Sequence, residues 1–154
     1  MKIEVVHVGR IKSAWIKEGI EHYRKLLTRD AVVTLRSVRE CDSAALPPEK
    51  VKEEEGKRIL SLLGGEAYTI VLNEHGRQFD SQRFSDQLEK IKLSASKILL
   101  VVGGAFGLSE EVSSRANLLL SLSKMTYPHE LTVLVVLEQL YRAFSIGRGT
   151  KYHK

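Results

Sequence analysis

The chain has 154 residues, of which 43% are hydrophobic and 28% are charged, and its formal net charge is +5. This length and composition fit one domain with a real core and exclude global disorder. The single cysteine, Cys41, excludes an intramolecular disulfide and a cysteine-based metal site. No apolar run reaches the ~18 residues that a membrane helix needs, and the N-terminus shows no signal-peptide pattern, so we expect a cytoplasmic protein without a membrane anchor. The moderate positive charge favours an anionic partner.

Short β-rich segments alternate with segments of helical periodicity along the whole chain. The expected strands are residues 2–8, 31–38, 67–72, 97–102 and 118–122. The expected helices are residues 13–27, 47–63, 82–92, 110–118 and 128–147. This alternation predicts a single α/β domain, residues 1–154, with a mostly parallel sheet flanked by helices.

Prolines, glycines and charge runs indicate where several of these helices begin and end. Proline is tolerated in the first turn of a helix, so Pro47-Pro48 and Pro128 are read as helix starts. Glycine ends helices, so Gly64-Gly65 and Gly147 are read as stops. The charged run 49–55 is typical of a solvated helix face with ion pairs one turn apart.

The expected helix 128–147 is apolar on nearly all sides. Its apolar residues include Leu131, Val133, Leu134, Val135, Val136, Leu137 and Leu140. A helix with this pattern is buried on most sides, and a chain this short can lack the material to cover it alone. We therefore expect the helix to hold a homodimer together, and the polar loop 121–126 that leads into it to hold a ligand.

Three expected strands end in polar or glycine-rich loops, at residues 72–76, 103–107 and 122–127. In open α/β sheets, ligands bind at the carboxyl ends of the strands. Glycines in the second loop leave the backbone free to approach a ligand closely. Its pattern, GGAFG, has neither dinucleotide-site nor P-loop spacing, so by itself it favours a tight turn between a strand and a helix over a ligand site.

The polar residues offer little recognisable catalytic apparatus. No histidine and glutamate cluster has metal-ligand spacing, so we expect no metal, and no serine lies in a G-x-S-x-G elbow. The polar candidates are His129, Glu138, Arg142, Tyr152 and His153. A lone histidine near a helix start is more often structural than catalytic. The tail 151–154 suits a phosphate backbone and an unpaired base, although a frayed terminus is a competing interpretation.

Four blocks in the C-terminal half, in order and spacing, resemble a known family. They are VGGAFGL at 102–108, SLSKMTYPH at 121–129, EQLYRA at 138–143 and YHK at 152–154. The chain resembles the bacterial 23S rRNA pseudouridine-N3 methyltransferases of the SPOUT class over its whole length. The resemblance implies a SPOUT-type α/β knot, with a deep trefoil knot in the C-terminal half. It also implies a homodimer whose interface includes the last helix.

The resemblance further implies S-adenosyl-L-methionine as cofactor and, as substrate, a pseudouridine in helix 69 of 23S rRNA on the assembled ribosome. The implied cofactor site consists of Leu72, Gly103, Leu122, Ser123, Lys124, Met125, Thr126 and Tyr127. For methyl transfer to N3, the candidates for contacting the base are His129, Tyr152 and His153. Arg142 and Lys154 are candidates for phosphate contacts or charge stabilisation. The general base stays open, since the imide proton can also pass to water.

Two positions depart from the family pattern. Val133 stands where the family usually has arginine, and Lys151 replaces a small residue or proline. Neither lies in the cofactor loops. These two departures therefore bear on the identity of the substrate more than on the identity of the cofactor. Two alternatives remain: a related knotted methyltransferase acting on tRNA, and a non-catalytic dimer that binds the ribosome. The sequence also leaves open which subunit's tail completes each active site and whether free rRNA suffices.

Overall fold

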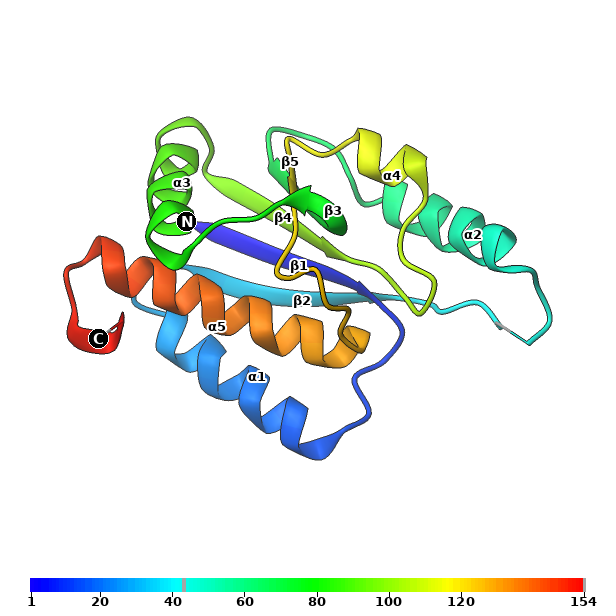
Figure 1. Ribbon diagram of the computed structural model, residues 1–154, viewed down its shortest axis with the longest axis horizontal. Helices are drawn as coiled ribbons and strands as arrows, with labels where there is room; N and C mark the ends of the chain where they lie inside the picture. Colours follow the sequence, from blue (N-terminus) through cyan, green and yellow to red (C-terminus); the bar gives the residue numbers. More distant parts are fainter. Residues whose placement is uncertain (43, 154) are drawn as a thin grey trace.

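The computed structural model describes residues 1–42 and 44–153, except for the side chain of His153. Five strands form one sheet in the order β2-β1-β4-β3-β5, and neighbouring strands are parallel (Figure 1). The strands are β1 Lys2–Val8, β2 Val32–Val38, β3 Tyr68–Arg77, β4 Lys97–Val102 and β5 Leu118–Leu120. The helices are α1 Ala14–Leu27, α2 Pro48–Leu60, α3 Ser81–Ser94, α4 Glu110–Ser114, α5 His129–Gly147 and the short 3-10 helix η1 Lys151–His153. The predicted α/β fold with a parallel sheet is confirmed.

Helices cover both faces of the sheet, as alternate side chains of the central strand β4 show. Ile98, Leu100 and Val102 pack in one core with residues of α1, α3 and α5. Leu99 and Val101 pack in a second core with residues of α2 and α4. Because helices cover both faces, residues 98–102 are all buried, which explains the continuous apolar run in the sequence.

Strand β3 continues to Arg77, so the prediction that it ends at Leu72 was wrong. Both Leu72 and Arg77 pair with Leu120 of β5, and the register shifts between them. The four intervening residues therefore bulge out of the strand, and the backbone N–H of His75 donates to Asn73 Oδ1 at 2.9 Å. The expected polar loop exists as this bulge at the end of the sheet.

Two helices are shorter than predicted. Helix α4 ends at Ser114 instead of 118, because Asn117 already pairs with β3. Its Oδ1 accepts from the Thr69 N–H at 2.7 Å, and its own N–H donates to the Thr69 carbonyl at 2.9 Å. Helix α2 ends at Leu60 instead of 63, because Ser61 and Leu62 already form a turn before the glycine pair.

Helix α5 packs across the sheet and contacts both α1 and α3 (Figure 1). Its buried residues include Val133, Val136, Leu137, Leu140, Ala143 and Phe144. Val133, at the position of the expected arginine, is fully buried, so this departure from the family serves the core. Leu131, Leu134 and Val135 are only half-buried in the protomer. The helix is therefore covered on one side by its own chain, and the predicted homodimer stays a prediction.

Glu130 ties the start of α5 to the start of α1. Its carboxylate accepts from the backbone N–H groups of Lys12, at 2.8 Å, and Ser13, at 3.1 Å. The hydrogen bond from Lys12 is the main reason why the pKa of Glu130 is lowered to about 2. Within the described residues, Ser13 makes no side-chain capping bond of its own, so Glu130 satisfies the backbone at the entry to α1.

We predict that Glu130→Gln removes a pH-dependent part of the stability. The pKa of Glu130 falls from about 4.5 to about 2 on folding, so the ionised contact stabilises fully above pH 4.5 and is lost as the pH falls toward 2. Urea-unfolding midpoints of the wild type and the variant should differ by a constant margin at neutral pH, and the margin should shrink in acid. Glu18→Gln, on exposed α1 surface, is the control, and a margin independent of pH would contradict the assignment.

Candidate functional site

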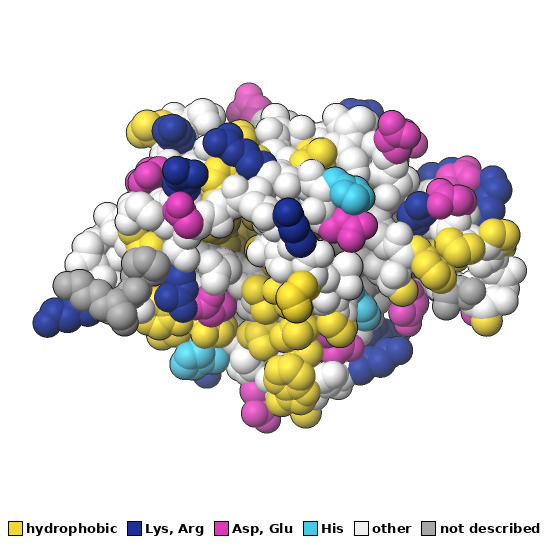
Figure 2. Space-filling model, in the orientation of Figure 1, with side chains coloured by type: hydrophobic (Ala, Val, Ile, Leu, Met, Phe, Trp, Pro, Cys, Tyr) yellow, Lys and Arg dark blue, Asp and Glu magenta, His cyan; other side chains and the backbone are white. Residues whose placement is uncertain are grey.

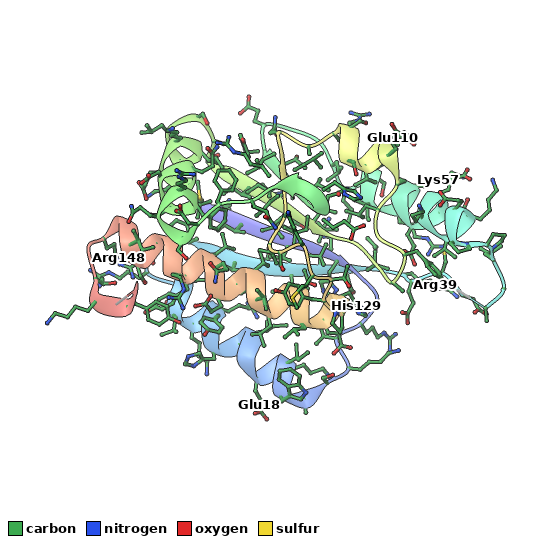
Figure 3. The ribbon with its side chains drawn as sticks, in the orientation of Figure 1. Glu18, Arg39, Lys57, Glu110, His129 and Arg148 are labelled. Carbon is green, nitrogen blue, oxygen red and sulfur yellow. The ribbon has the colours of Figure 1, made fainter. Side chains whose placement is uncertain are left out.

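A cavity of about 800 Å³ lies at the carboxyl ends of β3, β4 and β5, a volume within the range of small-molecule sites. Its walls come mainly from the bulge of β3, at residues 72–75, and from the segments around the ends of β4 and β5, at residues 102–108 and 120–129. The start of α5, labelled at His129 in Figure 3, closes one side. The expectation that the three strand ends meet at one ligand-sized site is therefore met by the geometry.

Most of the residues predicted to hold a cofactor lie on this cavity. Those that line it are Leu72, Gly103, Leu122, Ser123, Met125, Thr126 and Tyr127. Lys124 is exposed and does not line it. Sequence reasoning gave no role to several other lining residues, among them Phe106 and Lys52. Phe106 was visible in the glycine loop but was given no role, and Lys52 comes from α2, which no local signal connects to the site.

The glycine loop is a tight turn that also forms a cavity wall. The N–H of Gly107 donates to the Gly104 carbonyl at 3.1 Å, and Gly107 has φ +83°, which favours glycine. A Cβ on Gly103 would lie 2.9 Å from the backbone carbon of Gly107 and 2.9 Å from Leu108 Cγ. The interpretation as a tight turn therefore holds, and the approach of a ligand to this backbone stays a prediction.

The loop before α5 is shaped by its own hydroxyl groups. Ser121 Oγ donates to the Ser123 carbonyl at 3.0 Å, and the N–H of Met125 donates to Ser123 Oγ at 2.9 Å. The N–H of Ser121 also donates to the Arg77 carbonyl at 3.0 Å, which attaches the loop to the end of β3. Such local bonds explain why this segment is rich in serine and threonine.

Two histidines each have a buried ring nitrogen without a hydrogen-bond partner among the described residues. His129 lines the cavity, and its Nε2 is buried and has no hydrogen-bond partner among the described residues. A Cβ on Gly9 would lie 3.7 Å from this nitrogen. His7, at the end of β1, is also buried, and burial is the main reason why its pKa is lowered. His7 is therefore neutral at pH 7. The sequence around it has an ordinary strand pattern and gave no sign that this histidine is buried.

Arg142 and Tyr152 lie together near the other end of α5. Arg142 donates from Nε, at 3.0 Å, and from Nη2, at 2.5 Å, to Glu138 Oε1, and this bond is the main reason why the pKa of Arg142 is raised. The Tyr152 hydroxyl donates to the same oxygen at 3.3 Å, and its ring lies 4.6 Å from the ring of Tyr141. Burial, above all, raises the pKa of Tyr152, so its hydroxyl stays protonated at neutral pH.

The predicted catalytic residues therefore form two groups in one protomer. His129 and Arg142 are 13 positions apart on one helix, which corresponds to roughly 20 Å at ~1.5 Å per residue. Figure 3 shows His129 and Arg148 labelled toward opposite ends of α5. The side chain of His153 and all of Lys154 lie outside the described residues.

The described part of the chain has neither a membrane-spanning helix nor a group of side chains suited to a metal ion. None of its helices combines the length and apolar character needed to cross a membrane. No group of three or more histidine, cysteine or acidic residues in residues 1–42 and 44–153 could hold a metal ion.

This fold and site define a class of methyltransferase. A family model described as "Predicted SPOUT methyltransferase" matches residues 1–153, and the chain belongs to this family. A probable methylase family protein from Haemophilus influenzae shares the fold with a TM-score of 0.57 and 16% identity, over 99% of this chain and 70% of that one. Ribosomal RNA small subunit methyltransferase E from Neisseria gonorrhoeae, bound to S-adenosyl methionine, shares it with a TM-score of 0.51 and 12% identity, over 91% and 65%.

Full-length relatives are much more similar in sequence. Proteins named Ribosomal RNA large subunit methyltransferase H from Streptococcus gordonii and Streptococcus pneumoniae are each 42% identical to this chain over 159 residues. The alignments cover 100% of this chain and 100% of each relative. The family resemblance drawn from the C-terminal blocks is therefore confirmed.

We predict that Gly103→Ala destabilises the protein by ~1–3 kcal/mol, the usual cost of forcing extra atoms into a packed site. The added Cβ would meet backbone atoms of Gly107 at 2.9–3.0 Å, and backbone cannot rotate away as a side chain can. Gly64→Ala is the matched control, because a Cβ there would meet nothing within 4 Å. Equal free energies of unfolding for the two variants, measured in urea, would refute the close packing of the turn.

Proposed function

We propose that this protein transfers a methyl group from S-adenosyl-L-methionine to N3 of a pseudouridine in helix 69 of 23S rRNA, on the assembled ribosome. The observation that carries the proposal is the meeting of three strand-end loops around one cavity in a SPOUT domain. The full-length relatives, named for a large-subunit rRNA methyltransferase, support the choice of rRNA over tRNA.

The cavity fits the proposed cofactor in size and chemistry. Its walls combine apolar side chains, such as Leu72, Val102 and Leu122, with the backbone of a glycine turn and a hydroxyl-rich loop. A pocket that combines apolar walls with fixed polar groups suits an adenosine joined to an amino acid. When bound, S-adenosyl-L-methionine supplies a methyl group that its sulfonium already activates. The protein's own residues must then align the acceptor base and help to remove its N3 proton.

His129 is the candidate general base that the geometry favours. It lines the cavity, and its buried Nε2 has no hydrogen-bond partner among the described residues, so no described contact commits this nitrogen to a structural role. Tyr152 is a hydrogen-bond donor at neutral pH and not a base, since burial raises the pKa of its hydroxyl. Arg142 stays charged beside it and suits a phosphate contact.

We infer a homodimer in which the tail of one protomer serves the cavity of the other. Within one protomer, Tyr152 packs on Tyr141 and Glu138, too far along α5 to reach the base-binding end. Figure 2 shows apolar side chains gathered over the beginnings of α1 and α5. Exposed apolar residues of this region include Trp15, which is 62% exposed, and Met125, which is 72% exposed. A large apolar patch beside a ligand site is typical of a subunit interface.

The experiment that tests the proposed function uses ribosomes that lack their own methyl group in helix 69. They are incubated with the protein and labelled S-adenosyl-L-methionine, and the labelled nucleotide is mapped. We expect the methyl group on N3 of the pseudouridine. Transfer to tRNA alone would identify the related tRNA enzyme, and cofactor binding without any transfer would identify a non-catalytic dimer. Either result would refute the proposal.

We predict that deletion of residues 152–154 lowers the rate of methyl transfer by at least ~100-fold, the order of loss when a reacting group is no longer correctly positioned. Cofactor affinity, measured by calorimetry, should stay unchanged, because the tail is proposed to contact the acceptor base and Tyr152 is not among the residues that line the cavity. Leu93→Ser, an exposed change on α3, is the control. Equal loss of transfer and of cofactor binding would show that the tail does not have this role.

A further inference from the structure

Phe106 is displayed at the mouth of the cavity. It lines the cavity and is 40% exposed, whereas the deeper wall residues Val102 and Leu120 are buried. Ala105 and Phe106 form the tip of the turn that Gly104 and Gly107 close. A large aromatic side chain left in water beside a ligand site indicates a contact with something that binds there.

The turn that carries Phe106 packs directly against neighbouring elements. A Cβ on Gly104 would lie 2.8 Å from Glu55 Oε2 and 3.1 Å from Val8 Cγ1, so the backbone rests directly on α2 and β1. Glu55 is itself buried, although it belongs to the charged run 49–55, and its Oε1 accepts from the Cys41 N–H at 2.9 Å. A turn held in this way fixes the backbone that carries Phe106. Less conformational freedom is then lost when the ring binds a partner, which lowers the entropic cost of binding.

Other side chains at the mouth have the same chemical character. His75, on the bulge of β3, has a side chain that is 88% exposed, and Tyr127, on the loop before α5, is 40% exposed. Both line the cavity, so three separate loops each bring one π-face to it. Unpaired RNA bases are recognised by stacking on such faces, and every base has a face to stack.

We propose that Phe106 stacks on an unpaired nucleobase of the RNA substrate at the mouth of the cavity. This inference rests on the proposed function and adds a substrate-binding residue to it. The other exposed rings at the mouth, His75 and Tyr127, favour a base over an apolar protein surface, because their flat faces suit stacking. Asn73 and Glu74, which line the same cavity, are polar and suit the edges of a base.

The test compares Phe106→Ala, Phe106→Leu and Phe106→Tyr by steady-state methyl transfer to ribosomes lacking the modification. Stacking predicts that the alanine and leucine variants raise KM for the ribosome by about 5- to 100-fold, and that tyrosine retains the wild-type value. Calorimetry with S-adenosyl-L-methionine alone should give the wild-type affinity for all three variants. Leu93→Ala, at a side chain that is 90% exposed on α3, is the control and should change neither quantity.

Several outcomes would overturn the inference. A parallel loss of cofactor affinity would mean that the ring covers the cofactor, and full rescue by leucine would mean an apolar contact instead of stacking. Dissociation of the dimer by Phe106→Ala, seen in sedimentation, would mean that a second copy covers the ring. An active wild type with an equally active alanine variant would refute only the stacking. An inactive wild type would refute the proposed function, and the stacking with it.

Discussion

The packing of α5 across the sheet is the constraint on which the rest of the structure depends. Its buried residues, such as Val136, Leu137 and Leu140, each contribute ~1.5–3 kcal/mol on burial, so the helix has little freedom to move. Glu130 attaches its first turn to α1, and Ser85 Oγ donates to the Ala143 carbonyl at 2.7 Å to attach its last turns to α3. The helix therefore fixes both the loop that precedes it and the tail that follows it.

This rigid helix separates two chemically distinct groups. Its first residue, His129, lies at the edge of the sheet where β3, β4 and β5 end, which is where a parallel sheet collects its ligand loops. Arg142, Glu138 and Tyr152 form a bonded cluster farther along the same helix. A single protomer holds them apart, and the proposed dimer is the arrangement that brings a tail to a cavity. The apolar patch around Trp15 and Met125, beside the cavity, supports an interface at that place.

The sequence predicted those features that local patterns encode. The apolar run of β4, the proline at the start of α2 and the three strand-end loops all follow from residue periodicity and turn chemistry. The assignment of a cofactor to these loops came from family resemblance, because GGAFG alone fits any tight turn. The deep trefoil knot also came from the resemblance and stays a prediction.

Features that depend on tertiary contacts could not be predicted. Asn117 ends α4 early only because it meets Thr69 on another strand, and the bulge of β3 depends on its pairing with Leu120. Glu55 looks like its exposed neighbours in the sequence but is buried under the glycine turn. His7 has an ordinary strand neighbourhood, and its burial appears only when α5 lies across β1.

The most direct test of this account mixes two inactive variants and measures methyl transfer by the mixed dimers. One variant lacks residues 152–154 and keeps its cavity. The other carries Gly103→Val, which displaces the glycine turn in the cavity wall, and keeps its tail. Sedimentation confirms that the two subunits assemble. If the tail of one subunit serves the cavity of the other, the mixed dimer has one complete site and activity returns. A mixture that assembles but stays inactive would contradict the account.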